Sequence, residues 1–91
     1  MELSFNLENI DLREFWGVNN KNFKFLETIF PTLNLIERAG KLAIQGEEKD
    51  IKDFTKFFDN LLIVFEKQGY LEEKIIMSVL QENEYFKNKE E

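Results

Sequence analysis

The feature that most constrains the fold is a long apolar stripe in the second half of the chain. Over residues 47–68, apolar side chains recur at helical spacing, namely Ile51, Phe54, Phe58, Leu61, Leu62 and Phe65. Acidic residues open the segment, Lys67 lies near its end, and Gly69 follows where a helix commonly terminates. A helix with one broad apolar face must bury that face, so the rest of the chain has to supply a covering layer.

Three short segments alternate apolar and polar residues, as strands with one buried face do. They are residues 3–8, 33–37 and 41–45. The last two flank Arg38-Ala39-Gly40, and Gly40 can take the positive φ of a tight turn, so a β-hairpin is predicted. The opposite face of the sheet is expected to be polar and to carry Ser4, Asn6, Glu8, Asn34 and Gln45.

Three more helices are predicted from caps, spacing and breakers. Residues 11–16 begin with Asp11 as an N-cap, and a second helix spans about residues 20–30, capped by Asn19 or Asn20 and ended by Pro31. A last helix runs from about 72 to 83, and its apolar side carries Leu71, Ile75, Ile76, Val79 and Leu80.

The predicted fold class is α+β, a two-layer domain with a three-stranded antiparallel sheet covered on one face by helices. Residues 1–83 are expected to form one domain, and the charged residues 84–91 a linker or terminal segment. Phe57 and Val64 lie off the long stripe and are expected to pack against the last helix or a partner.

The composition excludes most catalytic chemistry. The 91 residues include no cysteine and no histidine, so the chain offers no thiol nucleophile, disulfide, Cys/His zinc site or imidazole base. Acidic pairs such as Glu47-Glu48 and Glu72-Glu73 lie at helix starts, where the helix dipole accounts for them without metal. We therefore predict a domain that is not an enzyme, with no catalytic, metal-binding or cofactor-binding residues of its own.

Charge and hydropathy limit the possible cellular location and the possible binding partners. No apolar run approaches the ~20 residues that span a bilayer, and the N-terminus lacks the features of a signal peptide, so a cytoplasmic location without membrane contact is expected. The net charge of −6 opposes strong nucleic-acid binding. However, 12 of the 18 acidic residues lie in residues 47–91, and the charge around Gly17 is locally positive because of Lys21 and Lys24.

One turn is a candidate binding site. Gly17-Val18-Asn19-Asn20, called the Gly17 turn below, joins the two short helices. It resembles the Gly-x-x-Gly loop of a type I KH domain, whose β-α-turn-α-β-β-α order is also the order predicted for this chain. Such a loop lets the backbone approach a nucleic-acid strand, while amides at the next helix start can meet phosphates. Asn20 replaces the second glycine, and asparagine tolerates left-handed φ.

Two longer stretches resemble the PhoH-like (phosphate starvation-inducible) P-loop ATPases. The first is residues 15–27, through the Gly17 turn, and the second is residues 36–47, with Arg38-Ala39-Gly40-Lys41 and Gly46-Glu47. The similarity covers about residues 5–83. In that family the region is a KH-like module ahead of an ATPase domain, and the family is associated with ATP binding and RNA metabolism. This chain has no Gly-x-x-x-x-Gly-Lys-Ser/Thr motif, so ATP and Mg are implied only for a missing downstream domain.

The resemblance implies a non-catalytic accessory domain that presents RNA or single-stranded nucleic acid weakly and sits beside its own ATPase domain. The candidate contact residues are Gly17, Val18, Asn19, Asn20, Lys21, Lys24, Arg38 and Lys41. Each also has a purely structural explanation, as a helix–helix turn, a solvated helix face or ordinary hairpin polarity. Phe15 and Trp16 are expected in the core or at a subunit contact, with base stacking as the other reading. The alternative function is a protein-interaction or homo-oligomerisation module that positions the ATPase domain without binding nucleic acid.

Overall fold

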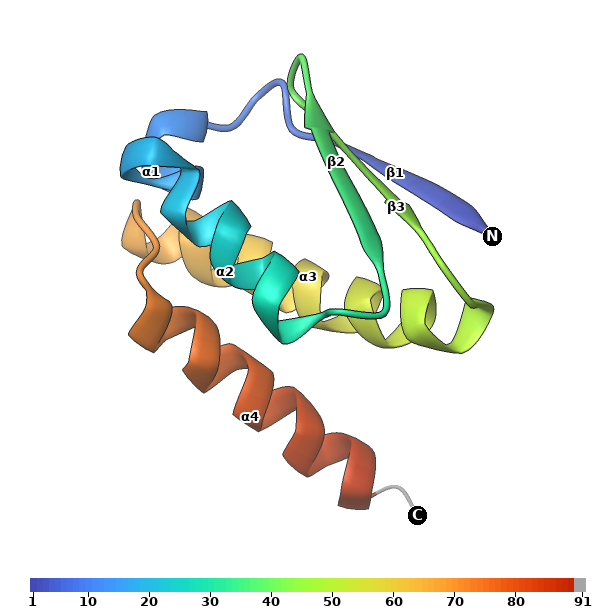
Figure 1. The fold of residues 1–91 in the computed structure, drawn as a ribbon. Coiled ribbons are helices and arrows are strands. Elements are labelled where there is room, and N and C mark those ends of the chain that lie inside the picture. The colour runs from blue at the N-terminus through green and yellow to red at the C-terminus, as the bar shows by residue number, and fades with distance from the viewer. Residues whose placement is uncertain (90–91) are drawn as a thin grey trace.

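The computed structural model describes residues 1–89, with side chains described as far as residue 83. Its elements are β1 (Glu2–Asn6), α1 (Leu12–Trp16), the short 3-10 helix η1 (Val18–Asn20), α2 (Lys21–Ile29), β2 (Asn34–Arg38), β3 (Lys41–Gln45), α3 (Glu48–Gln68) and α4 (Glu73–Lys89). In Figure 1 the sheet lies above α2 and α3, and α4 runs below them. The helix predicted to end near residue 83 continues to Lys89, because glutamate and lysine sustain a helix after the apolar spacing has stopped.

The sheet is three-stranded and antiparallel, as predicted, with β3 in the centre and β1 and β2 on its two edges. The register aligns Leu3, Ile44 and Leu35 in one row that faces the helices. Neighbouring rows point to the opposite side of the sheet because side chains alternate along a strand. The fold is therefore the predicted two-layer α+β arrangement.

The side of the sheet turned away from the helices, called the open face, is mostly polar. Gln45 donates a hydrogen bond to Glu2 at 2.7 Å and accepts one from Asn34 at 3.0 Å, so one row forms a ladder across all three strands. The middle row is less polar than predicted, because Ala43 and Ile36 lie beside Ser4. The predicted Glu8 lies outside β1, which ends at Asn6.

A two-residue turn joins β2 to β3. Ala39 (φ 51°) and Gly40 (φ 77°) both adopt positive φ, which is the requirement of the type I′ turn that matches the twist of a hairpin. The predicted conformation of Gly40 is confirmed, whereas Arg38 belongs to the strand and not to the turn. The Gly40 carbonyl accepts a hydrogen bond of 2.7 Å from the Leu7 amide, which holds the chain after β1 against the hairpin.

The aromatic stripe on α3 forms the centre of the core, as predicted. Phe54 and Phe58 are fully buried and stack at 5.3 Å, and Phe5 of β1 packs against Phe58 at 4.7 Å. Phe57 is also fully buried, and it packs against Phe30 at the end of α2, at 5.2 Å. The apolar face of α3 is thus wider than the predicted stripe, because it meets α2 as well as the sheet.

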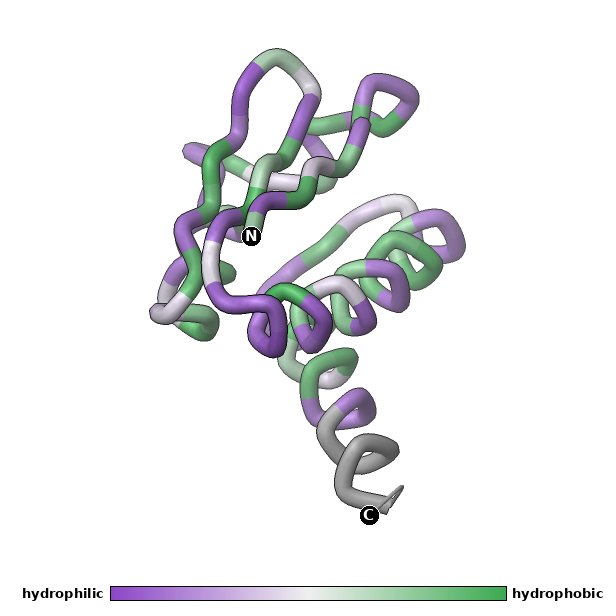
Figure 2. Tube along the Cα trace, turned by 90° about the vertical axis from the view of Figure 1, so that its right-hand side faces the viewer, coloured by the Kyte–Doolittle hydropathy of each residue, from purple (hydrophilic) through white to green (hydrophobic). Residues whose placement is uncertain are grey.

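Gly69 ends α3 and begins the connection to α4. Gly69 takes the left-handed conformation (φ 82°) and its amide donates to the Phe65 carbonyl at 2.7 Å, as predicted for a helix C-terminus. Val64 and Val79 both line a hollow between α3 and α4. In Figure 2 hydrophobic and hydrophilic residues alternate along α3, as its amphipathic sequence requires. Among the described residues, no helix is both long and apolar enough to cross a lipid bilayer.

Candidate nucleic-acid interface

The Gly17 turn reverses the chain between α1 and α2 with three positive-φ residues. Gly17 has φ 77° and ψ −179°, and Asn19 and Asn20 have φ values of 56° and 55°. The conformation of Gly17 is one that only glycine adopts readily. Its amide donates to the Arg13 carbonyl at 3.0 Å, and its carbonyl accepts from the Asn20 amide at 3.1 Å. The turn is therefore held by its own backbone and presents side chains outward.

The helix caps on either side of the turn differ from each other. Asp11 accepts hydrogen bonds from the Arg13 and Glu14 amides at 3.1 and 3.4 Å, so the predicted N-cap of α1 is confirmed. Asn20 occupies the N-cap position of α2, but its side chain makes no capping hydrogen bond. The predicted cap is wrong because capping requires an extended backbone, and Asn20 is left-handed.

Asn22 holds the turn in place, a role that the sequence analysis missed. Its side chain is fully buried, and Nδ2 donates to the carbonyls of Phe15 at 2.9 Å and Leu71 at 3.1 Å. It therefore ties the end of α1 and the start of α2 to the α3–α4 connection. The sequence does contain a signal for this role. Asn22 lies four residues before Leu26, so its polar side chain falls on the buried side of α2.

Among the residues that the structure describes, two buried polar atoms near the turn have no hydrogen-bond partner, Asn22 Oδ1 and Trp16 Nε1. The Trp16 ring packs edge-on against Phe15 at 4.8 Å and Phe23 at 5.3 Å. Phe15 and Trp16 are 0% and 2% exposed, so they belong to the core, which is the first of the locations predicted for them. Buried rings of this kind cannot stack on a base without a rearrangement of the core.

An open hollow of about 510 Å³ lies beside the Gly17 turn and is called the turn hollow. It is lined by Leu12, Arg13, Glu14 and Trp16 of α1, by the four residues of the turn, and by Glu37 of β2. Val18 is 75% exposed at its rim. The structure thus brings together four of the predicted contact residues with a strand residue that was not predicted.

Charge at the turn hollow is mixed. Arg13, Glu14 and Glu37 all line it. Lys21 lies beside the turn without lining the hollow, since its Cγ and Cε would be 3.2 Å from a Cβ on Gly17. Lys24 is exposed one helical turn further along α2 and does not line the hollow.

Arg38 and Lys41 lie elsewhere. They are cross-strand partners in the last row of the hairpin, on the open face of the sheet. Strand alternation turns Glu37 toward the helices and its neighbour Arg38 away from them. The sheet side of the turn hollow is therefore formed by a carboxylate and not by the two predicted cations.

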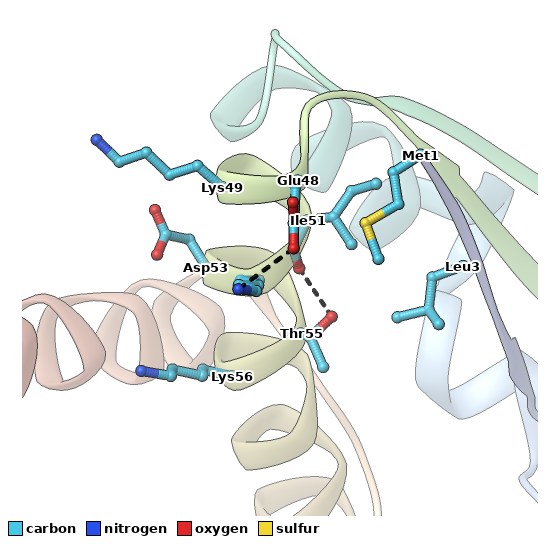
Figure 3. Close-up of a pocket in the computed structure, with 9 residues that line it drawn as sticks. Met1, Leu3, Glu48, Lys49, Ile51, Asp53, Thr55 and Lys56 are labelled. Carbon is cyan, nitrogen blue, oxygen red and sulfur yellow. Dashed lines mark hydrogen bonds and ion pairs between the residues drawn. The ribbon is translucent and has the colours of Figure 1, made fainter.

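A larger hollow, of about 660 Å³, lies between β1 and the first half of α3 (Figure 3). Met1, Leu3 and Ile51 give it an apolar side, while Glu48 and Lys52 form an exposed ion pair at 3.4 Å. Such an exposed pair contributes little binding or stability. Within the described part of the chain, no group of acidic residues could hold a metal ion.

Comparison with known proteins gives no family for this chain. No family model matches it, and no curated protein or solved structure resembles it at a significant level.

Proposed function

We propose that this chain is a non-catalytic accessory module that holds single-stranded nucleic acid, RNA in particular, weakly at the Gly17 turn. The observation that carries the proposal is an exposed turn with three positive-φ residues that borders a hollow between α1 and β2. In the proposed complex a phosphate approaches the turn and Lys21, and a neighbouring base enters the turn hollow. The start of α2 supports phosphate contact through its helix dipole, which favours anions, and no side chain caps it.

The proposed binding is weak for electrostatic reasons. Only Lys21 and Lys24 flank the turn on α2, the two carboxylates Glu14 and Glu37 outnumber Arg13 in the lining of the hollow, and the whole chain carries a charge of −6. Two phosphate contacts to a single strand correspond to a salt slope of only about −1.4 in log K against log salt. The module would therefore act as part of a larger assembly that supplies further contacts.

We propose that this assembly is a PhoH-like ATPase of the cytoplasm, in which the chain is a KH-like module beside its own ATPase domain. The order of the elements, the place of the Gly17 turn and the resemblance of residues 15–27 and 36–47 support this proposal. ATP and Mg would belong to the ATPase domain. The absence of cysteine agrees with a reducing compartment.

The test is a titration of fluorescently labelled single-stranded RNA at low salt. Lys21→Glu/Lys24→Glu should weaken binding by at least about fivefold and reduce the magnitude of the salt slope by about 1.4. The control is Lys49→Glu/Lys56→Glu, which changes the net charge equally on exposed positions of α3. No binding by the wild type, or equal loss in both variants, would contradict the proposal.

Exposed apolar side chains are the observation that supports the alternative function, an assembly module. Ile63 is 51% exposed and Tyr70 is 44% exposed, at the end of α3 and just after it. Single exposed residues of this kind are common on monomeric proteins, so they support the assembly function less than the turn supports binding. Sedimentation velocity decides between them: concentration-dependent dimerisation that leaves RNA unbound would favour the assembly module.

A further inference from the structure

Glu37 occupies an unusual position for a charged residue. It lies on edge strand β2 in the row of Phe5 and Leu42, on the side of the sheet that faces the helices. Leu35, two residues earlier on the same side, is buried, whereas Glu37 is half-buried and lines the turn hollow. Among the described residues, none forms an ion pair or hydrogen bond with its side chain. A carboxylate at the rim of the core is thus left with unused acceptors.

The chemistry of those acceptors distinguishes the bases. A carboxylate only accepts hydrogen bonds, and it has two oxygens side by side. On its Watson–Crick edge, guanine alone presents two adjacent donors, N1–H and N2–H, whereas adenine, cytosine and uracil each place an acceptor beside their donor. These edges are accessible in single strands. We propose that Glu37 is a specificity-determining residue that selects guanine in the turn hollow; this inference rests on the nucleic-acid function proposed above.

Glu37 is better placed for this role than the other carboxylate of the hollow. Glu14 is exposed on α1, where water competes for its oxygens. Glu37 is half-buried, and a hydrogen bond discriminates more strongly where water is partly excluded. Its strand is fixed by five residue pairs with β3, so its backbone position is firmly held.

A purely structural role for Glu37 gives a different expectation. Charged residues that point inward from edge strands hinder the pairing of that edge with another chain. In that case Glu37→Gln would increase self-association and leave base preference unchanged. Guanine selection instead predicts a change in the ratio of two affinities, which loss of a charge alone cannot produce.

The experiment compares three RNA octamers by fluorescence anisotropy: all uridine, one central guanosine in uridines, and one central inosine in uridines. Inosine lacks only the N2 amino group of guanine. The wild type should prefer the guanosine octamer over the uridine octamer by about tenfold, within the range of a bidentate base contact. It should prefer guanosine over inosine by about threefold, since one of two donors is lost.

Two variants test whether Glu37 causes the guanosine preference. Glu37→Gln should bind all octamers with a guanosine preference below about twofold, and Glu14→Gln should keep the wild-type preference. Binding of all three octamers with equal affinity by the wild type would overturn guanine selection while leaving the proposed function intact. No binding of any octamer would overturn both, and loss of the preference in Glu14→Gln alone would overturn the assignment to Glu37. The inosine comparison needs no variant, so a folding defect in Glu37→Gln cannot obscure the answer.

Discussion

Gly17→Ala should destabilise the fold far more than the same substitution at another positive-φ glycine. Gly17 combines φ 77° with ψ −179°, a conformation that costs a residue with a Cβ about 1–3 kcal/mol. A Cβ there would also lie 3.2 Å from Lys21 Cγ and Cε and 3.3 Å from Asn22 Nδ2. The exposed lysine can move aside, but the buried amide of Asn22 can move only by weakening its two hydrogen bonds.

The magnitude follows from these two terms. Weakening one of the Asn22 hydrogen bonds adds about 1 kcal/mol to the strain, so Gly17→Ala should lower the free energy of unfolding by about 2–4 kcal/mol. Gly69→Ala is the matched control, because Gly69 has a similar φ of 82° but, apart from the adjoining chain and among the described residues, nothing lies within 4 Å of the added Cβ. Its cost should be about 1 kcal/mol, the ordinary price of a left-handed alanine.

Urea denaturation followed by circular dichroism measures both variants. The denaturation midpoints should shift in that order while the slope m stays constant, because the amount of surface exposed on unfolding does not change. Equal losses for the two variants would show that Asn22 adds nothing at Gly17. A smaller loss at Gly17 than at Gly69 would refute the reasoning about its backbone conformation as well.

Three further predictions concern single contacts. Asn22→Ala should lower the free energy of unfolding by about 2–4 kcal/mol, measured by urea denaturation, because the carbonyls of Phe15 and Leu71 lose their donor in a buried place; a loss below 1 kcal/mol would contradict this. Asp11→Ala should lower the free energy of unfolding by about 1 kcal/mol in the same assay, because α1 loses its N-cap. Asp11→Asn should keep most of that stability, since asparagine also caps helices. Arg38→Glu/Lys41→Glu should weaken RNA binding less than Lys21→Glu/Lys24→Glu in the anisotropy titration, because those cations lie on the open face; an equal or larger effect would move the interface to the sheet.

The positions of the elements could be predicted because their signals are local. The spacing of Phe54, Phe58 and Leu61 predicts a helix without knowledge of its partners, and Asp11 and Gly69 mark helix ends by their own chemistry. The order of the strands needed the structure. Alternation tells which side of β1 is buried, but not that β1 pairs with β3.

The candidate site was less predictable because its geometry depends on contacts distant in sequence. Asn22 reaches the Leu71 carbonyl, 49 residues further along the chain, and no local pattern indicates such a pair. The side occupied by Glu37 was predictable in principle. Since Leu35 points inward, alternation places Glu37 inward and Arg38 outward, which removes Arg38 and Lys41 from the turn hollow.

The same residues shape the fold and the proposed site, and this limits which variants can test function. Gly17 and Asn22 set the path of the turn through the backbone and a buried amide, so their replacement would alter stability and binding together. Lys21 lies exposed beside Gly17, Glu37 lines the hollow from a half-buried position, and neither side chain is buried in the core. Charge changes at these two positions should therefore alter RNA affinity and base preference while leaving the denaturation midpoint nearly constant. If both variants instead lost stability along with binding, the turn hollow would be a structural feature of the fold and not a nucleic-acid interface.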